Sequence, residues 1–309
     1  MACRGVSRGL CGVALDLFVY IWYNTDRALS AKEENEMSEK LSIETVDAGS
    51  FSMEYFKFGH GKRTLVILPG ISVQSVMLYA GSIAGAYGIF AASHTVYVFD
   101  RRKELPASYS VRDTARDTAE AFRLLGLDGI DLFGTSQGGA VALAIAAEHP
   151  EMIHKLVLGS TSAYVDEAHY RIFESWADLA RAGRRAELYL AFGEAVYPRD
   201  IFEQSRGLLT ELSESVTDED LARFIIQSEA MRGIDLRAEL PKISCPALVI
   251  GSLDDEVLGA DASVQIAKSL KGQKGTVLYM YSGYGHAVYD TAPDYKERLL
   301  SFLAQSPGQ

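Results

Sequence analysis

From about residue 41 the chain alternates short apolar runs with helical runs, and this alternation constrains the fold more than any other feature. Three of the apolar runs are "RTLVIL" at 63–68, "HTVYVFDRR" at 94–102 and "IDLF" at 130–133. Continuous β-branched runs bounded by Gly or Pro are typical of strands buried on both faces. Repeated strand–helix units predict an α/β fold with a mostly parallel sheet and helices on both faces. The runs 41–49 and 51–59 predict an antiparallel hairpin at its start.

The alternation stops between residues 164 and 240, where one helical run follows another without a strand-like run. The strand pattern resumes at "CPALVIG" (Cys245–Gly251) and at "GTVLYMYSG" (Gly275–Gly283). A block of helices between two strands of one sheet indicates an insertion. We therefore expect a core made of residues 37–163 and 241–309, and a helical cap at 164–240.

Residues 1–36 do not continue this pattern. The run "LCGVALDLFVYIWY" is apolar apart from Asp16, but it is shorter than the roughly 20 residues that a membrane-spanning helix needs. We interpret residues 1–36 as an N-terminal extension that is disordered or not native, because Met37 opens the domain-like sequence. The alternative is that residues 1–23 act as an anchor or an export signal, which would make the protein membrane-associated or exported.

Charge and cysteine content narrow the class of protein. The chain has 30 Lys and Arg against 41 Asp and Glu, a net charge of −11 over 309 residues. An acidic chain without a long basic run is a poor nucleic-acid binder, so we expect no such partner. Three scattered cysteines form neither a disulfide framework nor a metal-binding spacing. We expect a cytoplasmic protein, monomeric or homodimeric, with no metal.

One serine has the setting of a nucleophile. Gly134-Thr135-Ser136-Gln137-Gly138 matches G-x-S-x-G and lies between the strand-like "IDLF" and the helical "GGAVALAIAAEHP". Glycines two positions before and after the serine remove Cβ atoms that would clash in a sharp strand-to-helix turn. The N–H of Gln137 opens the helix, where unpaired donors favour negative charge.

A serine hydroxyl needs a general base, and an acid must orient that base. Of six histidines, His286 lies in the loop "SGYGHAVYDTAP" after the last predicted strand, and the other five have structural explanations. The order serine, acid, histidine places the acid in "LDDE", after the preceding strand. We prefer Asp254 as the acid and keep Asp255 as the alternative.

The remaining candidate site residues are predicted to bind the oxyanion or to line the substrate pocket. In "LPGISVQ", Gly70 permits a tight turn and the N–H of Ile71 can join that of Gln137 in an oxyanion hole. Ser72 could add a donor. Aromatic side chains of the helical block are expected to line the substrate pocket, although such residues more often serve packing. The candidate pocket residues are Ser72, Tyr164, Phe173, Trp176, Phe192 and Tyr197.

The ordered set Gly70-Ile71, Gly134–Gly138, Asp254 and His286 resembles the α/β-hydrolase fold superfamily over about residues 41–305. The resemblance implies an eight-stranded sheet, a Ser-His-Asp triad, and no metal or organic cofactor. The chain departs from the pattern at Pro69, where many members carry a histidine. A serine rather than an aspartate nucleophile argues against epoxide hydrolase and haloalkane dehalogenase chemistry.

These features predict a serine hydrolase that cleaves a small ester or related acyl substrate through an acyl-enzyme. The same triad serves C–C bond hydrolases, lactonases, thioesterases and cofactor-free perhydrolases, so these activities stay open. A non-catalytic ligand-binding module is the alternative of another class. Such a module has no need to retain a serine, a histidine and an acid together in this order.

Overall fold

The computed structural model describes residues 41–270, 272 and 275–305, which contain one eight-stranded sheet. Its order is β1-β2-β4-β3-β5-β6-β7-β8. Strand β2 is antiparallel to β1 and to β4, and the other neighbours are parallel. The strands are β1 (Glu44–Asp47), β2 (Ser52–Phe58), β3 (Arg63–Leu68), β4 (His94–Arg102), β5 (Ile130–Thr135), β6 (Ile153–Gly159), β7 (Ala247–Ser252) and β8 (Val277–Tyr281). The predicted fold class and the antiparallel hairpin are confirmed.

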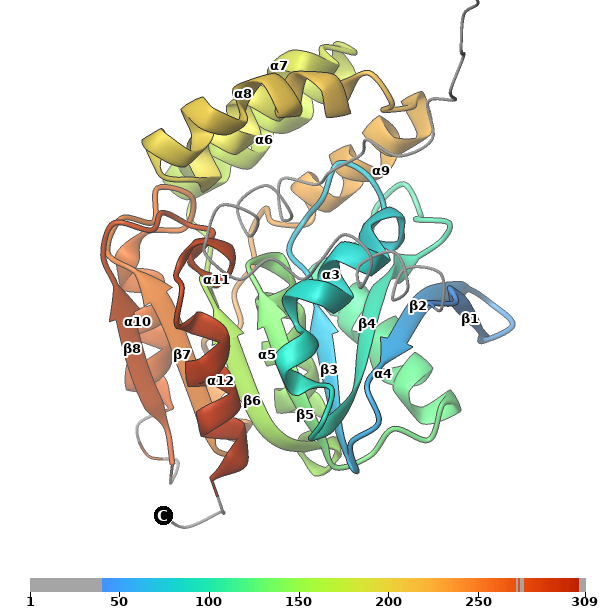
Figure 1. The fold of residues 1–309 in the computed structure, drawn as a ribbon, viewed down its shortest axis with the longest axis vertical. Helices are drawn as coiled ribbons and strands as arrows, with labels where there is room; N and C mark the ends of the chain where they lie inside the picture. The colour runs from blue at the N-terminus through green and yellow to red at the C-terminus, as the bar shows by residue number, and fades with distance from the viewer. Residues whose placement is uncertain (1–40, 271, 273–274, 306–309) are drawn as a thin grey trace, which may run out of the picture.

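Helices cover both faces of the sheet (Figure 1). Successive side chains of a strand point to opposite faces, so Leu65 and Ile67 of β3 pack on one side and Val66 and Leu68 on the other. The first side packs against α3 (Ala80–Ala86) and α12 (Tyr295–Ala304). The second packs against α4 (Val111–Leu124), α5 (Gln137–Glu148) and α10 (Ala260–Ser269). The shorter helices are η1 (Val76–Tyr79), η2 (Gly88–Phe90), η3 (Pro150–Met152), η4 (Leu240–Lys242) and α11 (Val288–Thr291).

Four helices are inserted between β6 and β7: α6 (Glu167–Arg181), α7 (Arg185–Val196), α8 (Arg199–Ser213) and α9 (Asp218–Glu229). They lie beyond the carboxyl ends of the parallel strands, at the top of Figure 1. The chain enters and leaves through a short antiparallel pairing, in which Val165 N–H donates to Ile234 O at 3.1 Å and Leu236 N–H donates to Ala163 O at 2.7 Å. The inserted helices therefore stand over the edge where α/β sheets carry their sites.

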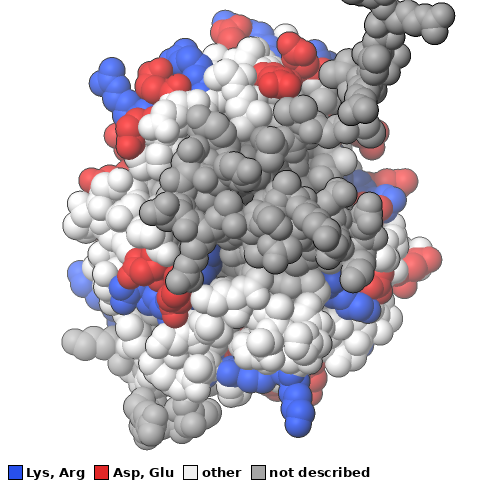
Figure 2. Space-filling model, viewed as in Figure 1, with Lys and Arg blue, Asp and Glu red and all other residues white. Residues whose placement is uncertain are grey.

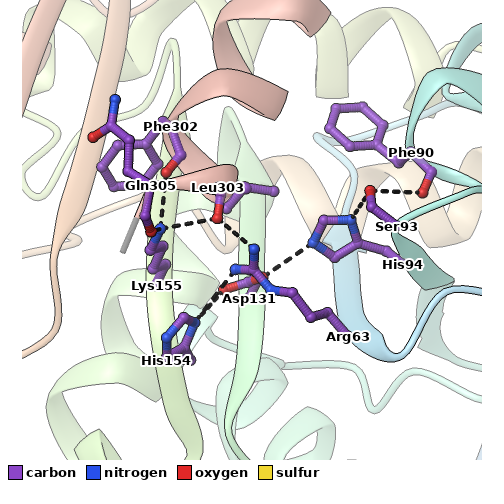
Figure 3. A network of polar contacts seen from close by, with 10 residues as sticks. All are labelled: Arg63, Phe90, Ser93, His94, Asp131, His154, Lys155, Phe302, Leu303 and Gln305. Atoms are coloured by element: carbon purple, nitrogen blue, oxygen red, sulfur yellow. Dashed lines mark hydrogen bonds and ion pairs between the residues drawn. The ribbon is translucent and has the colours of Figure 1, made fainter. Parts of the chain in front are cut away.

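A polar network closes the opposite, amino end of the sheet (Figure 3). The buried Asp131 of β5 accepts from Arg63 Nη2 at 2.5 Å and lies 2.8 Å from His154 Nδ1. Lys155, also buried, donates to the carbonyl oxygens of Phe302 and Leu303 at 2.9 Å each. The lysine satisfies carbonyls at the end of α12, and the carboxylate ties strands β3, β5 and β6 together.

On the face drawn in Figure 2, Lys and Arg side chains are interspersed with Asp and Glu rather than gathered by sign. Within the described ranges, no helix combines the length and apolar character needed to cross a bilayer. The proposed extension, residues 1–36, and the alternative anchor, residues 1–23, lie outside the described residues, which begin at residue 41.

Candidate active site

Ser136 occupies a sharp turn between β5 and α5. Its φ and ψ are 51° and −124°, a left-handed value of φ that side chains other than glycine rarely adopt. The backbone is held there because the Ser136 N–H donates to Gly159 O at 2.9 Å, and Thr161 Oγ1 donates to Ser136 O at 2.6 Å. The strain is thus compensated by neighbouring hydrogen bonds, and the hydroxyl projects from the end of the strand.

The two glycines of the motif are required by close backbone contacts. A Cβ on Gly134 would lie 2.4 Å from Gly138 O. A Cβ on Gly138 would lie 2.1 Å from Leu68 O, in the strand next to β5. Both distances are well below any van der Waals contact, so only glycine fits either position.

A continuous hydrogen-bond chain leads from this serine to a buried carboxylate. His286 Nε2 lies 3.0 Å from Ser136 Oγ, and His286 Nδ1 lies 2.8 Å from Asp255 Oδ2. All three residues are buried. Because a carboxylate only accepts, Nδ1 carries the proton toward Asp255, and Nε2 is left to accept from the serine. We call Ser136, His286 and Asp255 the Ser136 chain.

The preference for Asp254 as the residue that contacts the histidine is wrong. Asp254 is exposed, and its Oδ2 accepts from the N–H of Gly283. Asp255 turns inward instead, where its Oδ1 accepts from Val257 N–H at 2.9 Å and Leu258 N–H at 3.0 Å. The tight turn after β7 therefore sends adjacent carboxylates to opposite sides, and the alternative, Asp255, faces His286.

The surroundings of Asp255 favour its ionised form. Burial alone would raise its pKa. The positive charge that His286 carries when protonated and its hydrogen bond act in the other direction, together with the N–H donors of Val257 and Leu258, and the net pKa lies below the ordinary value. A carboxylate that stays ionised beside Nδ1 can hold the imidazole in one tautomer and stabilise its protonated form.

Two backbone N–H groups near the serine, those of Ile71 and Gln137, were predicted to form an oxyanion hole. Within the described residues, neither Ile71 N nor Gln137 N donates to a protein acceptor. The loop that carries Ile71 abuts the serine, since a Cβ on Gly70 would lie 3.0 Å from Ser136 Cβ. Gly70 N–H itself donates to Thr135 Oγ1 at 3.2 Å, which fixes this loop to the end of β5.

A cavity of about 170 Å³ opens beside Gly70, Ile71 and Thr135 and extends under α7 and α8. Most of its wall is apolar or aromatic. Of the candidate pocket residues, Ser72, Phe192 and Tyr197 line it. Its wall includes Thr135, which precedes Ser136 in the chain, but neither Ser136 nor His286, so the cavity lies next to the serine rather than around it.

The other candidate pocket residues lie elsewhere. Trp176 is 1% exposed and packs between Phe173, with ring centroids 5.3 Å apart, and Phe192, at 4.8 Å. Tyr164 lies under the guanidinium of Arg237, 3.9 Å from its ring centroid, beside the stem of the insertion. Trp176 and Phe173 therefore support the insert from within, and neither they nor Tyr164 line the cavity beside Ser136.

Sequence reasoning missed one charged residue next to this site. Arg101 is the penultimate residue of β4 and is buried, and its Nη2 donates to Pro69 O and to Gln137 Oε1 at 3.0 Å each. The sequence signal was its position, a cation at the carboxyl end of a predicted strand. Pro69, the departure from the superfamily pattern, is thus held through its carbonyl oxygen.

Comparisons with known proteins agree with this architecture. The model of the alpha/beta hydrolase family matches residues 65–295. The chain is 26% identical to the human serine hydrolase BPHL over 74% of this chain and 76% of that protein. It is 28% identical to a putative carbamate hydrolase RutD of Stutzerimonas stutzeri, over 66% of this chain and 77% of that protein.

A solved structure extends the likeness to nearly the whole described fold. The enol-lactonase from Burkholderia xenovorans LB400 superposes with a TM-score of 0.73 at 18% identity, over 85% of this chain and 100% of that one. The family model covers well over half of the sequence, and the sheet order fits it. The chain therefore belongs to the alpha/beta hydrolase family and is a hydrolase enzyme on that fold.

Proposed function

We propose that the protein is a serine hydrolase that cleaves a small carboxylic ester, or a related acyl compound, through an acyl-enzyme on Ser136. The observation that carries the proposal is the Ser136 chain, with its contacts of 3.0 Å and 2.8 Å. The free N–H groups of Ile71 and Gln137 support it, because acyl transfer needs both an activated nucleophile and a place for negative charge.

Acylation begins when Ser136 Oγ attacks the ester carbonyl carbon and His286 Nε2 takes the hydroxyl proton. The carbonyl oxygen becomes an oxyanion, which the N–H groups of Ile71 and Gln137 bind. The tetrahedral intermediate collapses, the C–O bond to the alcohol breaks, and the imidazolium returns the proton to the leaving oxygen. Asp255 stabilises the imidazolium throughout without taking the proton.

Deacylation repeats these steps with water as the nucleophile. His286 Nε2 removes a proton from water, the hydroxide adds to the acyl carbonyl, and the same N–H groups bind the second oxyanion. When the intermediate collapses, the bond to Ser136 Oγ breaks and the proton returns to that oxygen. A carboxylic acid leaves, and the serine is regenerated.

The cavity beside Ser136 favours a substrate with an apolar group. Its wall includes Ile71, Phe192, Val196 and Leu209, so water in it is displaced favourably by hydrocarbon. The cavity has a volume of about 170 Å³, and we propose that it takes a short or medium-length acyl or alcohol group.

Hydrolysis of p-nitrophenyl esters tests the proposal. We expect turnover with a rapid burst that approaches one p-nitrophenol per enzyme when deacylation is slower than acylation. Ser136→Ala should lose both the burst and the turnover. Hydrolysis by Ser136→Ala at the rate of the unsubstituted enzyme would reject the serine mechanism.

A substrate panel separates the activities that share this triad. Esters of increasing acyl length, lactones, thioesters and C–C substrates are compared by kcat/KM with the same enzyme preparation. The proposal predicts the highest kcat/KM for an ester with an apolar group. A higher value for a β-diketone or a thioester would replace the ester assignment while leaving the role of Ser136 intact.

A further inference from the structure

Arg101 lies behind the two segments that carry the free N–H groups. It is 6% exposed, at the end of β4 and next to β3 in the sheet. From there one guanidinium nitrogen, Nη2, reaches both Pro69 O and Gln137 Oε1 at 3.0 Å. Pro69 begins the loop that leads to Ile71, and Gln137 follows the nucleophile. A single guanidinium nitrogen therefore connects the backbone of the loop that leads to Ile71 with the side chain of Gln137.

The contact continues into the inserted helices. Gln137 Nε2 donates to Gln227 O, on α9, at 2.6 Å. Both ends of the Gln137 amide are thus engaged, the oxygen by Arg101 and the nitrogen by α9. Since the side chain cannot rotate without losing both bonds, the first turn of α5 is fixed relative to β4 and to the insert.

Within the part of the chain that the structure describes, no ion pair neutralises the charge of Arg101. Among the described residues, no carboxylate oxygen lies within 4.0 Å of its guanidinium nitrogens. The adjacent Asp100 does not contact the guanidinium directly: its Oδ2 accepts from Ser75 Oγ at 2.5 Å and lies 3.8 Å from Arg223 Nη2, and its Oδ1 accepts from the Arg101 backbone N–H at 2.7 Å. Burial lowers the pKa of Arg101 to about 10, although the nearby charge of Asp100 acts in the opposite direction, so the group is still cationic at neutral pH. Burying an unpaired cation is costly, and nearby negative charge offsets that cost.

We propose that Arg101 is a positioning residue for the oxyanion hole: it holds the Ile71 loop and Gln137 at the spacing at which their N–H groups converge on one oxygen. The proposal rests on the proposed function, because the oxyanion forms only if Ser136 attacks a carbonyl. As the oxyanion develops, the buried positive charge also becomes partly compensated. The contribution of Arg101 therefore grows from the ground state to the transition state.

The test compares Arg101→Lys and Arg101→Met with Arg102→Lys. Arg102 is the adjacent arginine, and it contacts Asp117, Glu104 O and Ser50 O on the other side of the strand. We expect both Arg101 variants to lose about 100-fold in kcat with KM changed less than about threefold, the pattern of a weakened oxyanion site. Arg102→Lys should stay within about twofold of the unsubstituted enzyme.

A second readout separates positioning from a purely structural role. A trifluoromethyl ketone adds Ser136 Oγ to its carbonyl carbon and places an oxyanion in the site, whereas the matching methyl ketone binds mainly without this addition. We expect the affinity of the trifluoromethyl ketone to fall in parallel with kcat/KM in the Arg101 variants, and that of the methyl ketone to stay constant. Equal loss of both affinities, or unchanged trifluoromethyl ketone affinity, would overturn the proposal.

Two controls keep the result interpretable. If the Arg101 variants do not fold, Gln137→Met removes the amide oxygen that Arg101 binds while the backbone N–H remains, and we expect about a tenfold loss in kcat. Full activity in folded Gln137→Met would count against the proposal. Ser136→Ala distinguishes the two claims, since an active Ser136→Ala removes the proposed function itself. An inactive Ser136→Ala with fully active Arg101 variants removes only the role of Arg101.

Discussion

The two ends of the sheet each carry a serine, a histidine and an aspartate in hydrogen-bond contact. The carboxyl end has the Ser136 chain. At the amino end, Ser93 Oγ lies 2.8 Å from His94 Nδ1, and His94 Nε2 lies 3.2 Å from Asp131 Oδ2. We call these three residues the Ser93 chain; its contacts to neighbouring strands are drawn in Figure 3. The same three side chains at similar distances therefore occur twice in one sheet.

What surrounds each serine differs. Ser136 has a strained φ of 51° and follows Thr135, which lines the cavity. It precedes Gln137, the first residue of α5, and lies against the loop that carries Ile71. Ser93 is exposed, lies in the turn before β4, and its Oγ is also 3.3 Å from Phe90 O. Asp131, the aspartate of the Ser93 chain, also contacts Arg63 and His154. The comparison teaches that composition and spacing do not define a hydrolase site, because the oxyanion donors and the adjoining cavity are needed as well.

The largest expected difference between the two ends is in catalysis by the serines. Ser136→Ala should lower kcat/KM for a p-nitrophenyl ester by about 10⁵-fold, because the nucleophile is lost. Ser93→Ala should change it less than about twofold. Steady-state hydrolysis by the two purified variants measures both effects, and equal losses would remove the distinction between the chains.

The aspartates should differ almost as strongly. Asp255→Asn should lower kcat by about 10⁴-fold, since an amide stabilises neither the required tautomer nor the imidazolium. Asp254→Asn should cost less than about tenfold, because Asp254 reaches His286 only through the Gly283 loop. A larger loss in Asp254→Asn than in Asp255→Asn would contradict the geometry described above.

Much of the fold and part of the candidate site could be predicted from the sequence. The strands followed from continuous apolar runs, and Ser136 and His286 from glycine-flanked turns after strands. The choice between Asp254 and Asp255 could not be made, because adjacent side chains diverge according to turn dihedrals that the local sequence does not specify. The roles of Trp176 and Phe192 depend on how the inserted helices dock, and helical spacing alone does not determine docking.

Asp131→Asn should affect stability rather than turnover. Removing a buried charge that holds Arg63 and two histidines should lower the free energy of unfolding by about 3 kcal/mol at neutral pH, with kcat of the folded enzyme unchanged. Urea denaturation monitored by circular dichroism measures the free energy of unfolding. Loss of kcat without loss of stability would assign the Ser93 chain a catalytic role.

Asp131→Asn should also change how the free energy of unfolding depends on pH. Burial alone would raise the pKa of Asp131, but hydrogen bonds from His94 and His154 and the charge of Arg63 hold it below the ordinary value. A depressed pKa gives stability that is present above the unfolded value of about 3.9 and is lost as pH falls through the folded-state value. Urea denaturation at a series of pH values from neutral to below the unfolded value measures this dependence. The free energy of unfolding should fall less steeply with decreasing pH in Asp131→Asn than in the unsubstituted enzyme.

The smallest expected effect concerns the cavity beside Ser136. Phe192→Ala should enlarge it and raise the kcat/KM ratio of a longer over a shorter p-nitrophenyl ester by about tenfold. Leu124→Ala, an exposed position on α4, is the control and should leave the ratio unchanged. An unchanged ratio in Phe192→Ala would show that the substrate does not enter this cavity.

Mapping a fluorophosphonate adduct tests the central claim most directly. Both serines have a histidine and an aspartate, so one labelling reaction on the unsubstituted protein compares them under identical conditions. After digestion, mass spectrometry of the peptides that contain Ser136 and Ser93 gives the fraction of each that is modified. We predict complete, time-dependent modification of Ser136 and none of Ser93. Modification of Ser93 at a comparable rate, or an unmodified Ser136, would contradict the account.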